Sequence, residues 1–524
     1  MSNGERFKTD RFNEHATRTY GRMGSTTLRR TGLENVLSKA TTKNLTVLEK
    51  KMDPAHFREL LKKKPTPEKI WKEVKKREMD ETEETKEIIG MSLGNPNKFD
   101  DYPPNMRVNE CLAELPFEDI ETVREMAGYT ESFGYPPFIE MLKSVNFSDP
   151  KSVNRDPKKF KDIKVYFTAG ASQAAEIAMG PAILNPEDTL AVHDLIYIIY
   201  LGAAYFRNAH IESYECRDDG RPDSESLQEV LSMYSERNDR RIQAVAFTSI
   251  GNPVGAAMSE NDIIEHLKTV GKHSMKENRP IIAMVDVAYE AFRRGGKPLD
   301  PIEIAIDNEI PVALVVLDTS SKSYGTCGYR AGKLAIYWPD NYFGDYRDDY
   351  IMSLDTKILP TLGSVSVPIQ MAYYNFFRKL QENNGIMEET INFFKERREN
   401  ANKNLVYIAE ELRKTPGVYL AKYYDHAGKN GGLDPDTLSS FYALFGFSKL
   451  NELHGSGFNQ VVAFGDFASG VPEVPITDCI PSQSFLPEKR WAKHPALIRI
   501  TGLTNKEETE SFLNAVRAYA DYLG

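Results

Sequence analysis

A lysine behind a run of hydroxyl side chains is the residue of this sequence with the clearest chemical potential. The apolar run Pro311–Leu317 is typical of a buried strand, and Asp318-Thr319-Ser320-Ser321-Lys322 follows it, with Arg330 shortly after. A lysine amine forms Schiff bases with carbonyl groups. Hydroxyl and guanidinium groups are common phosphate ligands. The segment therefore combines a Schiff-base lysine with candidates for binding a phosphate.

Three other apolar runs also end in residues that can bind a ligand. Ile163–Phe167 precedes Gly170-Ala171-Ser172 and a helix, whose first backbone N–H groups (Ala171 and Ser172) form a natural phosphate site. Ile242–Phe247 precedes the turn Gly251-Asn252-Pro253-Val254-Gly255, and the run Ile281–Ala288 carries Asp286 and is followed by Tyr289. Ligands of open α/β sheets bind outside the carboxyl ends of the strands, so we expect these groups to converge.

These groups together predict a site for pyridoxal 5'-phosphate (PLP). PLP needs a lysine for its Schiff base and an acid for its pyridinium nitrogen. Asp286 lies in an apolar run, where an unpaired carboxylate is costly. A pyridinium would pair with it, and Asn252 and Tyr289 could donate hydrogen bonds to the phenolate oxygen of the ring. The residues expected around the phosphate are Ala171, Ser172, Thr319, Ser321 and Arg330.

Each of these residues also has a structural explanation when it is taken alone. Asp286 could form a salt bridge within the core. Asn252 could simply occupy a turn before proline, and Tyr289 could be an ordinary half-buried tyrosine. Thr319 and Ser321 could be polar loop residues. Packing alone does not explain why four strand ends carry complementary groups, and this convergence favours the cofactor site.

The same residues resemble the motifs of the class I/II aminotransferases, which are fold-type I PLP enzymes of the aspartate aminotransferase superfamily. The segment Ser321-Lys322-x-x-Gly325-x-x-Gly328-x-Arg330-x-Gly332 is similar to their cofactor-lysine signature. Asn252-Pro253-Val254-Gly255 resembles their Asn-Pro-x-Gly turn, and Asp286-x-x-Tyr289 their pyridinium and phenolate pair. The matches keep the order of the family from Gly94 to the C-terminus.

The resemblance implies further site residues. Tyr129 would reach the cofactor phosphate of a neighbouring subunit, which implies a homodimer or a higher homo-oligomer. Tyr197 would stack on the cofactor ring. Arg499 would clamp the α-carboxylate of the substrate, with Gly94 and Asn252 also lining the substrate pocket. Catalysis would rest on Lys322, Asp286 and Tyr289.

The implied activity is transfer of an amino group from an amino acid to a 2-oxo acid through a Schiff base on Lys322. Dicarboxylate-specific members carry a second arginine before a Ser/Asn-Pro segment, whereas residues 359–368 contain none. Fold does not determine reaction type. The alternative is therefore a PLP-dependent lyase or amino-acid β-decarboxylase, similar to aspartate 4-decarboxylase. A regulator or scaffold that kept the fold is a third, more distant alternative.

The elements that must position these residues follow from the pattern of apolar runs. Strand-like runs alternate with helical segments such as Ser224–Tyr234 and Glu260–Lys276 between residues 162 and 338, which predicts an α/β fold with a mostly parallel sheet between helices. A long helix is expected from Gln370 to Arg413. A smaller α/β region follows, with strands at Phe441–Phe447, Val461–Phe464 and Leu497–Ile500 and a last helix capped by Thr504 and Glu507.

These patterns divide the chain into four segments. Residues 1–85 form a helical or extended N-terminal arm, and residues 86–125 begin the small domain. Residues 126–370 form the large PLP-binding domain, and residues 371–524 form the long helix and the C-terminal small domain.

Composition sets the remaining limits. The 524 residues are 41% hydrophobic and 27% charged, and the formal net charge of −10 argues against nucleic acid or an anionic membrane as a partner. No apolar stretch is long enough to span a bilayer, and the N-terminus lacks the apolar region of a signal peptide. Cysteines are scattered without metal-ligand spacing. The four cysteines are Cys111, Cys216, Cys327 and Cys479. We expect a cytoplasmic enzyme that acts on small molecules and has no metal site.

Overall fold

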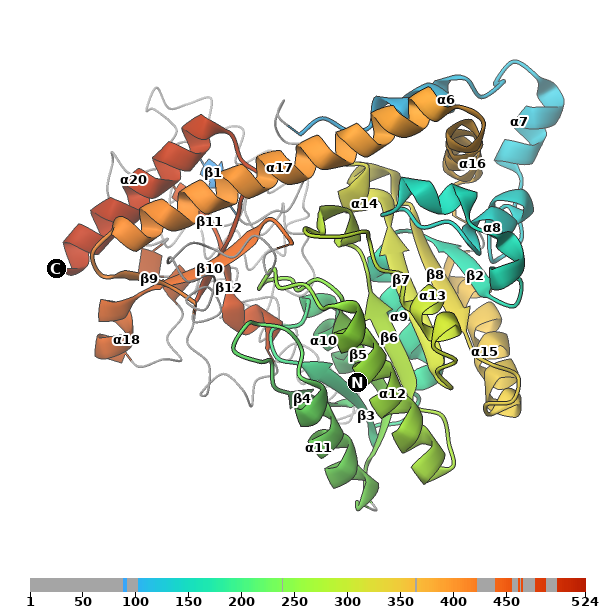
Figure 1. Ribbon diagram of the computed structural model, residues 1–524, viewed down its shortest axis with the longest axis horizontal. Coiled ribbons are helices and arrows are strands. Elements are labelled where there is room, and N and C mark those ends of the chain that lie inside the picture. The colour runs from blue at the N-terminus through green and yellow to red at the C-terminus, as the bar shows by residue number, and fades with distance from the viewer. Residues whose placement is uncertain are drawn as a thin grey trace, which may run out of the picture.

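The computed structural model describes residues 88–91, 102–237, 239–362, 365–421, 439–454, 460–461, 463–464, 476–486 and 497–524. A seven-stranded sheet forms its centre (Figure 1). Strand β8 runs antiparallel to both of its neighbours, β2 and β7, and the other neighbouring pairs are parallel. In spatial order the strands are β2 (Lys164–Thr168), β8 (Gly332–Tyr337), β7 (Ala313–Thr319), β6 (Ile282–Asp286), β5 (Arg241–Thr248), β3 (Asp188–His193) and β4 (His210–Tyr214).

Helices cover both faces of this sheet. Alternate strand residues enter different cores, as the period of two requires: Val315 packs with α9, α10 and α15, and Val316 packs with α11, α12 and α13. Both faces are buried, which explains why the strands are apolar throughout. The covering helices are α9 (Ala171–Ala182), α10 (Ile198–Tyr205) and α15 (Gly344–Leu362) on one face, and α11 (Ser224–Ser235), α12 (Glu260–Glu277) and α13 (Pro301–Asp307) on the other.

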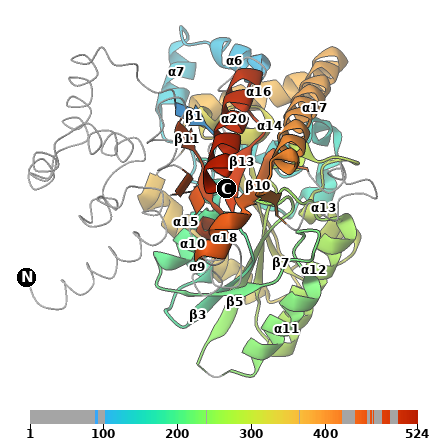
Figure 2. The same ribbon diagram turned by 90° about the vertical axis from the view of Figure 1, so that its left-hand side faces the viewer.

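A smaller sheet lies beside the large one and has its own core. Helix α17 (Asn384–Lys414) runs from this sheet across to the large one, and it lies beside the C-terminal helix α20 (Lys506–Leu523) (Figures 1 and 2). The small sheet is antiparallel and consists of β12 (Ile480–Pro481), β13 (Ile498–Thr501), β10 (Tyr442–Phe447) and β9 (Val418–Leu420). A separate parallel pair joins β1 (Ile88–Gly90) to β11 (Ile476–Asp478).

The remaining helices and 3-10 turns complete the described part of the chain. They are α6 (Met106–Ala113), α7 (Ile120–Ala127), α8 (Pro136–Leu142), α14 (Ser320–Ser323), α16 (Val367–Glu382), α18 (Ser448–His454), and the 3-10 turns η2 (Pro150–Asn154), η3 (Pro157–Phe160), η4 (Glu290–Phe292), η5 (Cys327–Tyr329) and η7 (Ser482–Phe485). None of the described helices has the length and apolar character needed to cross a membrane.

The predicted mixed α/β class and mostly parallel sheet are confirmed, and three details were wrong. The helix expected from Gln370 to Arg413 is two helices, because Asn383 takes an extended conformation and its side chain caps α17 by accepting from Gly385 N at 2.9 Å. Val461 and Phe464 lie in helical backbone rather than in a strand. A short apolar run does not distinguish a strand from a buried helix.

The third error concerns the cap of the last helix. The N-cap is Asn505 rather than Thr504, because the Asn505 side chain accepts a hydrogen bond from Glu508 N at 2.8 Å. The hydroxyl of Thr504 instead donates to the backbone oxygen of Asn505 at 2.8 Å. The N-terminal arm of residues 1–85 lies outside the described residues.

Candidate active site

The residues singled out in the sequence gather at one edge of the large sheet. Asp286 ends β6 and Thr319 ends β7, and these strands are parallel neighbours. Thr248 at the end of β5 pairs with Asp286. Because β8 is antiparallel, its first residue, Gly332, pairs with Thr319 and brings the preceding Arg330 to the same edge. Sheet topology therefore collects groups that lie far apart in the chain.

Asp286 is a buried carboxylate with no cation beside it among the described residues. Its Oδ1 accepts from Ala288 N at 2.9 Å, and its Oδ2 accepts from the hydroxyl of Tyr200 at 3.0 Å. Burial raises the pKa of Asp286, and the two hydrogen bonds only partly offset that effect. The described residues supply no positive charge that lowers its pKa. The salt bridge considered from the sequence is therefore not formed within the described part of the chain.

Tyr200 is a site residue that the sequence reasoning missed. It is fully buried in the first turn of α10, three residues after Tyr197. Residues three apart lie on the same side of a helix, so the spacing Tyr197-x-x-Tyr200 was the available signal. Burial and the neighbouring Asp286 raise the pKa of Tyr200 well above its usual value, so the hydroxyl remains a hydrogen-bond donor to the carboxylate.

A chain of hydrogen bonds joins the large sheet to the small one. Arg499 on β13 donates from Nη1 to Asn252 Oδ1 at 2.8 Å, and Asn252 Nδ2 donates to the Tyr289 hydroxyl oxygen at 3.2 Å. All three side chains are buried. Asn252 and Arg499 are 247 positions apart in the sequence. Asn252 therefore holds the guanidinium of Arg499 in place beside the strand ends of the large sheet.

Tyr442 on β10 is a second residue that the sequence did not indicate. The guanidinium carbon of Arg499 lies 4.3 Å from the centre of its ring, within the range of a cation–π contact. The hydroxyl groups of Tyr442 and Tyr289 are 3.4 Å apart. Burial raises the pKa of Tyr289 well above its usual value, so its hydroxyl keeps its proton. Tyr442 sits on an otherwise apolar strand, and only the contact with Arg499 distinguishes it.

The start of α9 and the loop before β8 pack closely together. Gly170 precedes α9 with a φ of 85°, which favours glycine. A Cβ on Gly332 would lie 2.6 Å from Gly170 Cα, and one on Gly170 would lie 2.7 Å from Arg330 Nη2. Arg330 donates to Ala169 O at 2.7 Å. The two glycines thus bring the guanidinium of Arg330 next to the first turn of α9, where Ala171 and Ser172 lie.

The hydroxyl groups before Lys322 are buried and face each other. Thr319 Oγ1 lies 2.9 Å from Ser321 Oγ and donates to Ala331 O at 2.9 Å. Thr319 also caps α14, the four-residue helix that contains Lys322. Lys322 itself is half-buried. The strand end and this short helix hold the three predicted side chains within one turn of backbone.

The remaining predicted residues are Tyr197, Tyr129 and Gly94. Tyr197 is half-buried just before α10 and packs against the cores of both the large and the small sheet. Tyr129 is 91% exposed, so it makes no site within this chain alone. Gly94 lies outside the described residues.

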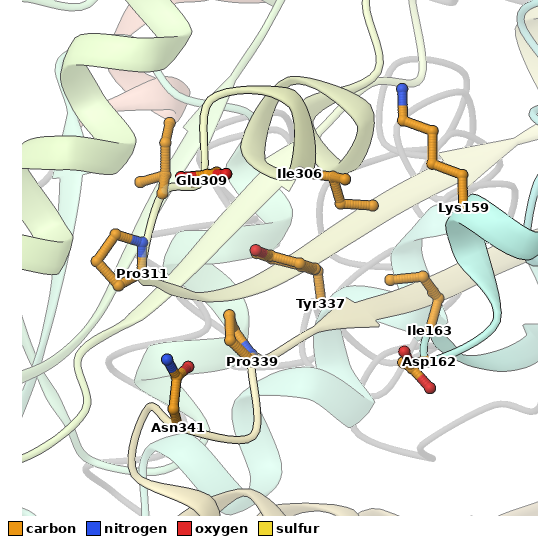
Figure 3. Close-up of a pocket in the computed structure, with 10 residues that line it drawn as sticks. Lys159, Asp162, Ile163, Ile306, Glu309, Pro311, Tyr337, Pro339 and Asn341 are labelled. Atoms are coloured by element: carbon orange, nitrogen blue, oxygen red, sulfur yellow. The ribbon is translucent and has the colours of Figure 1, made fainter.

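A separate pocket of about 570 Å³ opens at the opposite edge of the large sheet. Figure 3 shows Tyr337, the last residue of β8, between Ile163 and Pro311, which precede β2 and β7. These residues mark the amino ends of the parallel strands. The pocket is therefore remote from Asp286 and Lys322, and we assign it no part in the site.

Comparison with known proteins identifies the class to which this fold and site belong. Residues 86–433 match the family model described as aminotransferase class I and II. The chain belongs to this family of fold-type I PLP enzymes. The resemblance seen in the sequence motifs is thereby confirmed.

Curated relatives are distant and match only part of the chain. An alanine aminotransferase of Mycobacterium bovis is 21% identical over 286 residues, which are 54% of this chain and 59% of that protein. A putative alanine aminotransferase of Schizosaccharomyces pombe is 26% identical over 185 residues, covering 33% and 36% of the two chains. The chain thus spans about three fifths of the length of the first of these relatives.

Solved structures share the fold over most of its length. An aminotransferase from Escherichia coli has a TM-score of 0.60 at 16% identity and covers 86% of this chain and 94% of its own. An alanine aminotransferase from Pyrococcus furiosus has a TM-score of 0.59 at 18% identity, with coverages of 86% and 95%. The architecture of two sheets joined by long helices is therefore that of the aminotransferase fold.

The cofactor of this family, PLP, fits the residues that line the edge of the sheet. Asp286 is a buried carboxylate to which the described part of the chain brings no cation, and a pyridinium nitrogen is a cation of suitable charge. Protonated hydroxyl donors and the Arg330 guanidinium lie at the same edge as the amine of Lys322. The chemistry of this donor set matches the ring nitrogen, phosphate and aldehyde of PLP.

Proposed function

We propose that the chain is a PLP-dependent aminotransferase that moves an amino group from an amino acid to a 2-oxo acid. The observation that carries the proposal is the position of Asp286 at the strand-end edge that also bears Lys322. Asp286 is a buried carboxylate that no cation of the described residues accompanies. Family membership supports the same reaction class.

Lys322 and Asp286 have complementary chemical roles in this proposal. When bound, PLP supplies an electron sink for the bond that breaks at the α-carbon. Lys322 Nζ would hold the cofactor covalently, and its free amine would take the α-proton as general base. Asp286 keeps the ring nitrogen protonated by placing a negative charge beside it. Tyr200 holds the carboxylate in that orientation through its hydroxyl.

Arg499 binds the α-carboxylate of the amino acid in this proposal. Its guanidinium is held by Asn252 and by the ring of Tyr442, and a planar guanidinium suits a bidentate contact with a carboxylate. Tyr289, which keeps its proton because burial raises its pKa, donates to the phenolate oxygen of the cofactor together with Asn252. Tyr197 stacks on the ring.

The first turn of α9 would hold the phosphate of the cofactor. Its backbone N–H groups point out of the helix, and the helix dipole favours an anion there. The hydroxyls of Thr319 and Ser321 and the guanidinium of Arg330 add charge-assisted hydrogen bonds. The close packing of Gly170 against Arg330 supports this assignment.

The proposal includes a dimer and a division into domains. Tyr129 is 91% exposed, which suits a residue that contacts the phosphate of a neighbouring subunit. The pairing of β1 with β11 supports assigning residues 86–125 to the same small domain as residues 371–524, with residues 126–370 as the large domain. We also propose a cytoplasmic location, because so few and scattered cysteines in so long a chain do not suggest a disulfide scaffold.

The first experiment tests the position of the covalent link. The wild-type protein is reduced with borohydride in the presence of PLP, and the modified peptide is identified by mass spectrometry. We expect the label on Lys322 and none on Lys333, whose buried Nζ is occupied by three hydrogen-bond acceptors. Lys322→Ala should abolish the label and all turnover. A retained label in this variant would refute the assignment.

A second measurement separates transamination from lyase and decarboxylase chemistry. The PLP-loaded protein is mixed with one amino acid at a time, starting with L-alanine because curated relatives are alanine aminotransferases. A transaminase releases one 2-oxo acid per active site without an acceptor, and no ammonia or carbon dioxide. Multiple turnovers without an acceptor, with release of ammonia or carbon dioxide, would contradict the proposal and favour the lyase alternative.

A further inference from the structure

A fully buried carboxylate lies directly before the lysine segment, and the roles proposed above do not use it. Asp318 is the last residue but one of strand β7 and has no exposed surface. Its Oδ1 accepts from Thr319 N at 2.7 Å, and its Oδ2 accepts from Phe147 N at 2.8 Å. Asp318 therefore ties the end of β7 to the segment that follows α8.

A buried lysine stands opposite this carboxylate. Lys333 on β8 is the register partner of Asp318 and is 2% exposed. Its Nζ donates to Leu142 O at 3.1 Å, Val145 O at 2.8 Å and Asn146 Oδ1 at 2.6 Å. Asp318 and Lys333 thus both bind the segment Leu142–Phe147. Asp318 accepts from an N–H group of this segment, and Lys333 donates to three of its oxygen atoms.

Further charges surround the pair. Asn146 Nδ2 donates to Asp300 Oδ2 at 2.7 Å, and Arg155 Nη1 donates to the same oxygen at 2.5 Å. Burial raises the pKa of Asp318 to about 7, and Lys333 acts to lower it. Burial lowers the pKa of Lys333 to about 8, and the two aspartates act to raise it. Each charge of the pair therefore stabilises the ionised form of the other.

The backbone that Asp318 holds carries the cofactor residues. Thr319 follows directly, its hydroxyl contacts Ser321, and it caps the short helix that contains Lys322. Two opposite charges buried near each other are weak evidence for stability, because an apolar pair often packs equally well. An apolar residue at position 318, however, could not accept the N–H groups of Thr319 and Phe147. The geometry thus indicates a role in orientation.

We propose that Asp318 is a positioning residue of the reaction, which orients Thr319, Ser321 and Lys322 toward the cofactor, and that Lys333 is its counter-charge. This inference rests on the proposed function, because it assumes that Lys322 binds PLP. It assigns a role to two charges that lie beneath the site and touch neither substrate nor cofactor.

Asp318→Asn is the first test variant, and Asp188→Asn is its matched control. Asp188 is also a buried aspartate that accepts two backbone N–H groups, from Leu184 and Asn185, each at 2.8 Å, but it lies at the opposite end of the sheet. We measure the dissociation constant of PLP, kcat, KM, and the pH midpoint of the visible absorbance of the bound cofactor.

Asp318→Asn should weaken PLP binding and lower kcat, each by roughly tenfold or more, because one N–H group loses its acceptor and the lysine segment shifts. KM for the amino acid should change less than about twofold, because Arg499 is untouched. The pH midpoint of the absorbance should move in Asp318→Asn and stay at the wild-type value in Asp188→Asn.

The double variant Asp318→Leu with Lys333→Leu separates orientation from stability. It leaves no uncompensated charge, so we expect it to unfold at a temperature closer to that of the wild type than Asp318→Leu alone, which leaves the charge of Lys333 buried. Its PLP affinity and kcat should nevertheless stay as low as in Asp318→Asn. A stable double variant with wild-type PLP affinity, kcat and pH midpoint would overturn the inference.

The outcomes also separate this inference from the function on which it rests. If the wild type traps no PLP on Lys322, the proposed function fails and the inference fails with it. If the wild type traps PLP there but Asp318→Asn behaves like Asp188→Asn, only the role of Asp318 is refuted.

Discussion

Single buried side chains in this protein are prepared by their neighbours for the charge state that the proposed chemistry needs. Asp286 loses solvation, which raises its pKa. The Tyr200 hydroxyl partly offsets this effect, because its hydrogen bond stabilises the ionised carboxylate. Tyr289 keeps its proton for the same reason of burial. Arg499 is oriented by the amide of Asn252 and by the aromatic ring of Tyr442.

Arg499→Lys should raise KM for amino-acid substrates by roughly 10- to 100-fold, because an ammonium group cannot make the bidentate contact to a carboxylate. The change should affect kcat much less, since Arg499 binds the substrate in the ground state and the transition state alike. Steady-state kinetics with the best donor of the panel measure both values. Arg517→Lys, at a half-exposed ion pair on α20, is the control. A KM within twofold of the wild type would remove Arg499 from the substrate site.

At the scale of strands and helices, two buried histidines pack between β3 and α12. His193 ends β3, and its Nε2 lies 3.1 Å from Thr248 Oγ1, while His266 on α12 contacts the backbone oxygen of Asp262 at 2.9 Å. Burial lowers the pKa of both histidines to about 4. These elements are therefore packed around neutral imidazoles.

These pKa values predict a loss of stability in weak acid. The unfolded chain binds protons to these histidines near pH 6.5, whereas the folded chain does so only near pH 4. The contribution of the two histidines to the free energy of unfolding is present above about pH 6.5 and is lost as the pH falls toward 4. Between pH 7 and pH 5 the loss should be about 2 kcal/mol per histidine. Urea unfolding at both pH values measures it.

The control for this prediction is the double variant His193→Gln with His266→Gln, which keeps a polar side chain of similar size but cannot titrate. The free energy of unfolding of this variant should fall less between pH 7 and pH 5 than that of the wild type. Equal losses in the two proteins would show that other groups cause the pH dependence.

At the scale of the whole molecule, the proposed site needs both sheets and a second subunit. Arg499 comes from the small sheet and Asn252 from the large one, and α17 connects the two. Tyr129 is 91% exposed and lies in a part of the chain with several exposed apolar side chains, namely Met106, Phe117 and Ile120. Such exposure is unusual in a monomer and suits an interface.

We therefore predict that the holoenzyme sediments as a dimer or larger and loses activity on dilution. Tyr129→Phe should weaken PLP binding by about tenfold, the effect of losing one hydrogen bond to a charged group. Tyr522→Phe is the control, since Tyr522 is also exposed, at 72%, but lies on the C-terminal helix. A fully active monomer would refute the prediction.

Residues such as Asp286, Tyr289, Thr319 and Lys322 could be recognised from the sequence because each directly ends or follows an apolar strand. Local chain connectivity is enough to place them at the edge of a parallel sheet. The strand and helix pattern likewise predicted the mixed α/β fold with its mostly parallel sheet, because both faces of the large sheet are buried and its strands are apolar throughout.

Only the tertiary structure decided the contacts that cross the molecule. Tyr442 meets Arg499, and Asp318 stands opposite Lys333, because strands that are separated in the sequence become neighbours. The sequence around Asp318 shows an ordinary acid after a strand, and its burial becomes visible only when β8 and the segment after α8 close over it. Such contacts depend on how the sheets and helices pack, and the order of residues along the chain does not encode them locally.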